Sequence, residues 1–136
     1  MRLIDANIIL RHLLHDDEHL KSLADDIIYS GCFTTTEVIA EVVHVLLRVY
    51  KVPRHEISWA LHCVLLDVKV ENLKALRYAL GLFDQTSLDF VDCILVAYHK
   101  VLGVDIMSFD KKLNSALKKE FPIYQVEIPS ETFSNK

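Results

Sequence analysis

Short apolar segments alternate with longer helical patterns along this chain, and the alternation restricts the folds that it can adopt. The segments that read as strands lie at residues 3–4, 32–34, 68–70, 104–108 and near 123–128. Strands separated by a helix tend to run parallel, because a parallel pair needs a crossover connection. The sequence therefore predicts an α/β fold, in which helices cover both faces of a parallel sheet.

Helical periodicity and stop signals place the helices between these strands. Their expected bounds are near 7–14, 19–29, 34–50, 53–66, 73–83, 88–102 and 110–120. Gly31 and Gly103 stand where glycine ends a helix. Residues 34–37, Thr-Thr-Thr-Glu, match a capping box, in which a threonine accepts from the third helical amide and Glu37 bonds back. The core face of the helix that follows is predicted to comprise Ile39, Val42, Val43, Leu46, Leu47 and Tyr50.

Length and composition fit a single globular domain. The chain has 136 residues, and 51% of them are apolar and 25% charged. Only three glycines and three prolines are present, which excludes collagen-like and low-complexity chains and argues against a small β-sandwich rich in turns. We expect one domain over residues 1–128, followed by a polar tail at 129–136.

Charge, cysteine content and the N-terminal residues indicate which partners and which cellular compartment to expect. Fifteen Lys and Arg oppose nineteen Asp and Glu, a net charge of −4, so nucleic acid would need a local basic patch. Cys32, Cys63 and Cys93 are far apart among apolar residues, which favours reduced, buried thiols. An acid, Asp5, stands where a signal peptide would need apolar residues, and no apolar run approaches the ~18 residues that span a membrane. We therefore expect a cytoplasmic protein.

Two acids follow predicted strands. Asp5 comes directly after the first strand, and Asp110 follows the strand predicted at 104–108. Ligands of open α/β sheets bind at the carboxyl ends of the strands, so acids at these positions are candidate site residues.

Two further acids lie in the apolar helix predicted at 88–102. Asp89 and Asp92 are its only acids, and the helix has apolar residues on nearly every side. An ionised carboxylate in a buried helix costs several kcal/mol unless it is paired or bound to a metal. Asp89 has an ordinary explanation, since an acid in a first turn complements the helix dipole. Asp92 is the stronger candidate.

A fifth acid, Glu41, lies on the helix predicted at 34–50. It belongs to a stripe with Glu37, His44 and Arg48, opposite the core face, as on any solvated helix. Glu37 and Glu41 are like charges four residues apart, which costs a few tenths of a kcal/mol that a nearby cation would remove.

Asp5, Glu41, Asp92 and Asp110 thus come from four separate elements and offer only oxygen ligands. Such ligands suit Mg²⁺ or Mn²⁺, which also bind phosphate oxygens. This set is typical of metal-assisted phosphodiester hydrolysis, in which the metal lowers the pKa of a water molecule.

Four segments together resemble PIN domains: Asp-Ala-Asn at 5–7, Thr-Thr-Thr-Glu-Val-Ile-Ala-Glu at 34–41, Leu-Asp-Phe-Val-Asp-Cys-Ile-Leu-Val-Ala at 88–97 and Ser-Phe-Asp-Lys-Lys-Leu at 108–113. The resemblance covers residues 3 to about 128. It closely resembles the VapC-type ribonuclease toxins of toxin–antitoxin pairs. It implies a three-layer α/β/α fold with a central parallel sheet of about five strands.

The same resemblance implies a function and roles for individual residues. The chain would be a Mg²⁺- or Mn²⁺-dependent endoribonuclease, usually a homodimer, whose acidic site an antitoxin blocks. Its metal-binding and catalytic acids would be Asp5, Glu41, Asp92 and Asp110. Polar supports beside them would be Asn7, Asp89 and Ser108. Asp92 is preferred to Asp89 because Cys93-Ile94-Leu95, a small residue and two aliphatics, follow it as in the family. Cations beside the acids that could bind RNA phosphates are Arg11, Lys111 and Lys112.

Other interpretations stay open at this point. Glu41-x-x-His44 matches one element of a di-iron helical bundle, but such a site needs a second copy and two more glutamates. His15 and His19 would place two imidazoles on one helix face, and a third zinc ligand is not evident. The main rival is a PIN-like module that binds protein or RNA without hydrolysis, since a fold does not determine a function.

Overall fold

The computed structural model describes residues 1–122, and the chain divides into two compact units. The first unit is Met1–Glu71, and the second begins at Asn72. The predicted strand at 123–128 and the predicted tail at 129–136 lie outside the described residues. The expected single domain over residues 1–128 stays a prediction.

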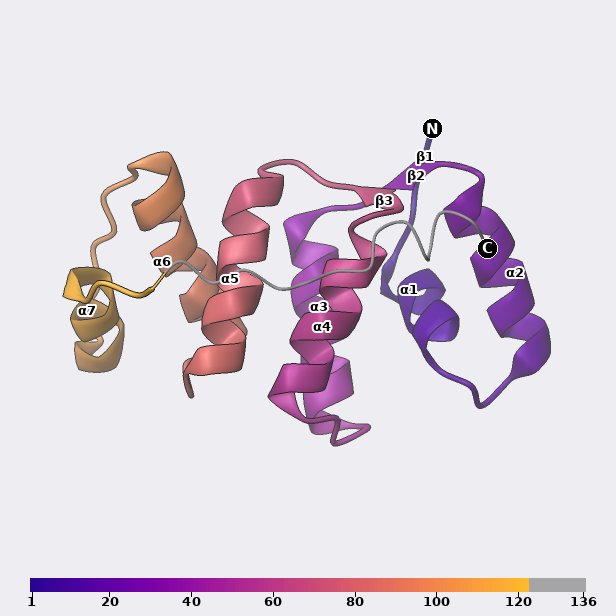
Figure 1. The fold of residues 1–136 in the computed structure, drawn as a ribbon, viewed down its shortest axis with the longest axis horizontal. Helices are drawn as coiled ribbons and strands as arrows, with labels where there is room; N and C mark the ends of the chain where they lie inside the picture. Colours follow the sequence, from indigo (N-terminus) through magenta and orange to yellow (C-terminus); the bar gives the residue numbers. More distant parts are fainter. Residues whose placement is uncertain (123–136) are drawn as a thin grey trace. The chain divides into compact units, whose positions relative to one another are not determined.

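The first unit contains the parallel sheet and four helices (Figure 1). Its elements in chain order are β1 (Arg2–Leu3), α1 (Ala6–Leu13), α2 (Glu18–Tyr29), β2 (Cys32–Phe33), α3 (Thr36–Arg48), α4 (Arg54–Val64) and β3 (Val68–Lys69). The strand order is β1-β2-β3, with Cys32 opposite Arg2 on one side and Val68 on the other. The prediction of an α/β fold with a parallel sheet is therefore confirmed.

Hydrogen bonds just beyond the short strands hold the sheet edge where the strands end. The Ile4 amide donates to the carbonyl of Phe33 at 2.9 Å, and the Thr34 amide donates to the carbonyl of Lys69 at 2.8 Å. The buried Thr34 hydroxyl donates to the Ile4 carbonyl at 2.9 Å. These bonds fix the chain immediately before α1 and α3, the two helices that carry the candidate acids of this unit.

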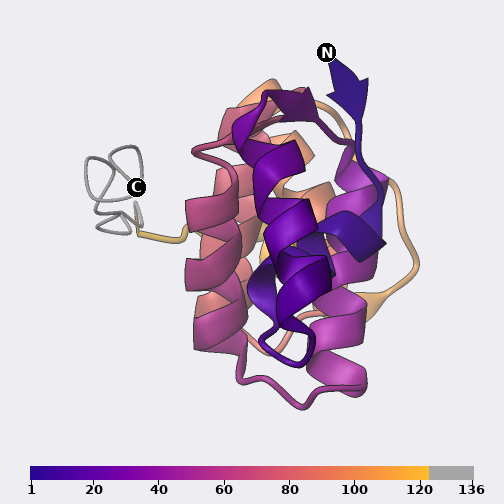
Figure 2. The same cartoon turned by 90° about the vertical axis from the view of Figure 1, so that its right-hand side faces the viewer.

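Helix packing in the first unit follows the predicted apolar faces. Helices α1 and α2 are neighbours joined by a short loop, as Figures 1 and 2 show. Ile9 of α1, Ile39 of α3 and Leu61 of α4 are completely buried. Tyr50, predicted on the core face of α3, instead follows the end of the helix at Arg48 and is 42% exposed. The core face therefore ends one turn earlier than the periodicity predicts.

The second unit is helical in its described part. It comprises α5 (Leu73–Gln85), α6 (Phe90–Leu102) and α7 (Lys111–Lys118). Helices α5 and α6 pack together, and the rings of Phe83 and Phe90 meet edge to face with centroids 5.6 Å apart. Gly103 ends α6 with a φ of 71°, the left-handed conformation that glycine adopts most easily.

The predicted number of strands is not reached. Residues 1–122 contain three strands, and the segment 104–108 is irregular. Strands are stable only when they pair, and the described part of the second unit contains no other strand. Met107 in this segment is 92% exposed. The strand predicted at 104–108 from its apolar pattern is therefore wrong.

Two smaller predictions can also be compared with the structure. The N-cap of α3 is Thr35, whose hydroxyl accepts from the Val38 amide at 3.2 Å. Glu37 is therefore the second helical residue and not the third, so the capping box predicted at residues 34–37 is wrong by one position. The three cysteines are buried and free of disulfides, as predicted. Within residues 1–122 no helix is long and apolar enough to cross a membrane.

Candidate active site

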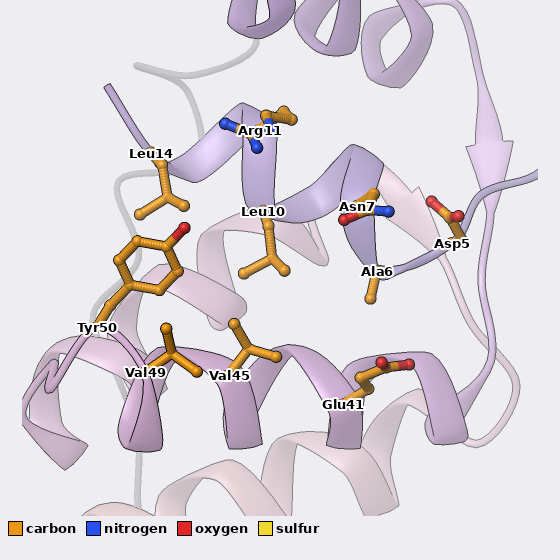
Figure 3. Close-up of a pocket in the computed structure, with 10 residues that line it drawn as sticks. All are labelled: Asp5, Ala6, Asn7, Leu10, Arg11, Leu14, Glu41, Val45, Val49 and Tyr50. Atoms are coloured by element: carbon orange, nitrogen blue, oxygen red, sulfur yellow. The ribbon is translucent and has the colours of Figure 1, made fainter. Parts of the chain in front are cut away.

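A small pocket in the first unit lies between α1 and α3, and two of the predicted acids line it (Figure 3). Its volume is about 280 Å³. Asp5, Asn7 and Glu41 lie together at one end of the pocket, where their polar atoms gather. The structure therefore brings Asp5 and Glu41 together from separate elements.

Asp5 owes its position to the junction between β1 and α1. It is the N-cap residue of α1, and its Oδ1 accepts from the Ile8 amide at 3.2 Å. An acid at a helix N-terminus is favoured, because the unpaired amides carry partial positive charge. Among residues 1–122 its second oxygen, Oδ2, makes no hydrogen bond, so the cap orients the carboxylate while leaving one oxygen for a ligand.

Glu41 is held on the solvent side of α3 by burial of the opposite face. Ile39, Val42 and Val43 are buried to 1% exposure or less, while Glu37 and Glu41 are exposed. The Thr35 cap fixes where the helix starts and hence which residues face the pocket. The predicted stripe is solvent-facing as expected, and Glu41 is the member of it that lines the pocket.

Arg11 brings positive charge to the same pocket. Its Nη1 lies 3.1 Å from Oδ1 of Asp16, and the two side chains are 36% and 52% exposed. Ion pairs this exposed contribute about 0–1 kcal/mol, so Arg11 can exchange Asp16 for another anion at little cost.

In the second unit the predicted acids gather around Asp92. This residue lies in the first turn of α6 and is half-buried. Burial raises its pKa, and the negative charges of Asp110 and Asp89 raise it further. The positive charge of Lys112 opposes this shift without cancelling it. Asp89, Asp92 and Asp110 therefore form a group of carboxylates with incomplete charge compensation.

Asp110 is positioned by the start of α7 rather than by a strand. It is the N-cap of α7, and its Oδ1 accepts from the Leu113 amide at 2.9 Å. Ser108 accepts from the Asp110 amide at 3.0 Å through its hydroxyl, and its carbonyl accepts from Nδ2 of Asn114 at 2.8 Å. The expectation that Asp110 follows a strand was wrong, and these local bonds hold it instead.

Asp89 occupies the N-cap position of α6 but makes no capping hydrogen bond through its side chain. The explanation from the sequence, that an acid at the start of a helix complements its dipole, still applies to Asp89, whose carboxylate is exposed. Lys112 is held near Asp89 by Ser87, because its Nζ donates to Oγ of Ser87 at 2.9 Å and to the Ser87 carbonyl at 3.3 Å. Lys111 is the first residue of α7 and is exposed.

Metal-binding capacity is divided between the two units. Over the described part of the chain, no three His, Cys, Asp or Glu side chains lie close enough together to hold a metal ion. Each unit does offer carboxylate oxygens suited to Mg²⁺ or Mn²⁺, Asp5 and Glu41 in the first and the Asp92 group in the second. The alternative zinc site does not form among residues 1–122, where Nδ1 of His15 lies 3.9 Å from a Glu18 oxygen.

The sequence interpretation missed the apolar half of the pocket. Leu10, Leu14, Val45, Val49 and Tyr50 form it. A usable signal was present in the spacing of Glu41, Val45 and Val49, because residues four apart share one helix face. Tyr50 carried no such signal, since the periodicity assigned it to the core.

Comparison with known proteins bears on what these acids do. A family model for the PIN domain matches residues 2–119. The chain belongs to the PIN-domain family. It is also 27% identical over 120 residues to a VapC ribonuclease of Aquifex aeolicus (strain VF5), a match that covers 82% of this chain and 89% of that protein. No solved structure matches the chain significantly.

The family match includes both units and every candidate acid. Residues 2–119 contain the pocket between α1 and α3 as well as the Asp92 group. The predicted resemblance to VapC-type PIN domains is thereby confirmed.

Proposed function

We propose that this protein is a Mg²⁺- or Mn²⁺-dependent endoribonuclease that hydrolyses RNA phosphodiester bonds with an activated water, as the toxin of a toxin–antitoxin pair. The match to the PIN domain and the similarity to a VapC ribonuclease support a nuclease that acts on RNA. The observation that carries the proposal is the pocket between α1 and α3, where Asp5 and Glu41 meet although 35 residues of chain separate them.

The residues present fit a hard divalent cation. Asp5, Asn7 and Glu41 offer only oxygen ligands apart from the Asn7 amide nitrogen, and neither cysteine nor histidine lines the pocket. In the second unit burial raises the pKa of Asp92 and the negative charges of Asp110 and Asp89 raise it further, and a bound cation would offset those charges. We propose, on the family resemblance, that the metal-binding acids are Asp5, Glu41, Asp92 and Asp110, supported by Asn7, Asp89 and Ser108.

When bound, the divalent ion would supply charge neutralisation at the phosphate and would make a water molecule more acidic. The chain's own residues do the positioning. The α1 and α7 caps orient Asp5 and Asp110, and the cations that we propose bind RNA phosphates are Arg11, Lys111 and Lys112. In the reaction the water oxygen attacks phosphorus, a phosphorus–oxygen bond of the RNA breaks, and the leaving oxygen takes up a proton.

Partners follow from the same proposal. We propose an antitoxin protein that blocks the acidic pocket, for which an arginine would complement Asp5 and Glu41. A homodimer and a cytoplasmic location are further parts of the proposal.

A matched pair of variants on α3 tests the catalytic role. Glu37 and Glu41 are both exposed acids of this helix, but Glu41 alone of the two lines the pocket. We expect Glu41→Gln to slow RNA cleavage about 100-fold or more, equivalent to about 2.7 kcal/mol of transition-state stabilisation. Glu37→Gln should cleave within about twofold of the wild type.

Two results would contradict the proposal. Equal cleavage by Glu41→Gln and Glu37→Gln would remove Glu41 from the site. Absence of cleavage by the wild type on any RNA, together with absence of Mg²⁺ and Mn²⁺ binding by calorimetry, would favour the binding module that does not hydrolyse RNA.

A further inference from the structure

We propose that the apolar half of the pocket between α1 and α3 binds the base of an unpaired nucleotide next to the scissile bond, with Tyr50 as its stacking surface. The inference deepens the proposed function and rests on it, because it assigns the pocket to the RNA substrate. It concerns Tyr50, which lies at the opposite end of the pocket from Asp5 and Glu41 (Figure 3).

The pocket has a polar and an apolar end. Asp5, Asn7 and Glu41 lie at the first, whereas the ring of Tyr50 lies beside Leu14 and Val49 at the second (Figure 3). Tyr50 is not buried in the core, since it is 42% exposed and the neighbouring Val49 is 66% exposed. An exposed tyrosine beside aliphatic side chains offers a flat apolar surface with a polar hydroxyl, which suits a nucleobase.

Helix geometry sets the reach between the two ends. Glu41, Val45 and Val49 are spaced by four residues and face the same pocket. Each residue of an α-helix rises 1.5 Å, so Glu41 and Val49 are about 12 Å apart along α3. A base at Tyr50 therefore belongs to a nucleotide near the phosphate at the acids and not to a distant part of the RNA.

Arg11 lies on α1 along the same pocket and can hold the phosphate between the two ends. Its present partner is Asp16, at 3.1 Å in an exposed pair. Such pairs exchange readily for another anion, and guanidinium groups bind phosphate oxygens with two donors. The same pocket is thus lined by an aromatic ring, a cation and the acids proposed to bind metal, the three groups that a base, a phosphate and the scissile bond require.

The size of the pocket also favours a base over a protein helix. Its volume, about 280 Å³, lies just below the range of about 300–1,000 Å³ for small-molecule pockets. One planar base fills such a space, whereas a docked helix needs a groove that takes several side chains.

Binding of nucleosides to the 136-residue chain tests the proposal without requiring catalysis. The probes are adenosine and uridine, with ribose as the control that lacks a base and N-acetyl-leucinamide as the control for a protein side chain. Nuclear magnetic resonance follows the methyl signals of Val45, Val49 and Leu14. We expect adenosine or uridine to shift these signals and ribose to leave them unchanged. We expect Tyr50→Phe to bind like the wild type and Tyr50→Ala to bind about 10-fold more weakly.

The matched control is Tyr29→Ala, because Tyr29 is 51% exposed on α2 and does not line the pocket. It should bind as the wild type does. The proposal is wrong if neither nucleoside shifts the pocket signals, if Tyr50→Ala binds them unchanged, or if N-acetyl-leucinamide alone shifts them, which would make the pocket a protein-binding site. The wild-type signals decide this even if Tyr50→Ala does not fold.

Cleavage of a randomised RNA pool then separates this inference from the proposed function. Sequencing of the product ends should show a base preference at one position next to the cut, which Tyr50→Ala loses and Tyr50→Phe keeps. An unchanged preference in Tyr50→Ala would overturn the base-binding role while leaving the ribonuclease intact. Nucleoside binding by a chain that cuts no RNA would instead overturn the ribonuclease and the position of the base beside a scissile bond, and only nucleoside binding at Tyr50 would remain.

Discussion

Replacement of Asp92 by asparagine should stabilise the protein in the absence of metal. The pKa of Asp92 is raised by burial and by the charges of Asp110 and Asp89, so the folded state disfavours its ionised form. A raised carboxyl pKa makes the unfolding free energy fall as the pH rises above the ordinary value of 3.8. At neutral pH this penalty is present in full, and Asp92→Asn removes it while keeping the shape of the side chain.

The size of the effect follows from the geometry of α6. A like charge three residues away, as Asp89 is, costs about 0.2–0.5 kcal/mol on a helix. Asp110 and partial burial add to this penalty, whereas the helix dipole recovers about 0.3–1 kcal/mol for an acid in the first turn. We expect a net gain of about 0.5 kcal/mol, which raises the melting temperature by about 1–3 °C.

Mg²⁺ should make the melting temperature of the wild type higher than that of Asp92→Asn, the reverse of the order expected without metal. At a Mg²⁺ concentration ten times the Kd, binding stabilises the wild type by about 1.4 kcal/mol, and Asp92→Asn loses most of this gain. The assay is thermal unfolding in EDTA and in a Mg²⁺ series, with Asp105→Asn as the control for loss of one exposed charge in the same unit. A lower melting temperature for Asp92→Asn than for Asp105→Asn in EDTA would refute this reasoning and assign Asp92 a structural partner.

Two further predictions concern the first unit. Burial alone would raise the pKa of Asp25, but hydrogen bonds and positive charge from Lys21 and His12 outweigh it and lower the pKa below 3.8. Asp25→Asn should therefore reduce the unfolding free energy by about 1–2 kcal/mol at pH 7, and urea titrations should show this difference disappearing as the pH falls below 3.8; a constant difference would contradict the linkage. Thr35→Ala removes the cap of α3 and should cost about 1 kcal/mol in the same titration, whereas Thr35→Ser should cost less; equal losses would argue against the capping bond.

Local signals predicted most of the fold. Gly103 ends α6 as predicted, because such an end signal depends on residues next to one another in sequence. The segment 104–108 shows the limit of such signals. Its apolar pattern is compatible with a strand, but pairing depends on a partner elsewhere in the chain, and the structure gives it none among residues 1–122.

The candidate site shows the same division between local and non-local information. Asp5 could be predicted from the end of a strand, and the structure adds that it caps α1. The neighbourhood of Glu41 could not be predicted from its own helix, because a solvated stripe looks alike wherever it faces. It took the packing of α1 against α3 to show that Glu41, and not Glu37, shares a pocket with Asp5.

The most direct test of the account is RNA cleavage by the purified wild type and by Asp5→Asn, each with Mg²⁺, Mn²⁺ or EDTA, on panels of single-stranded and structured RNA. The account predicts cutting by the wild type with either metal, none in EDTA, and loss of about 100-fold or more in Asp5→Asn. Cutting that persists in EDTA, or that Asp5→Asn retains at the wild-type rate, would contradict it.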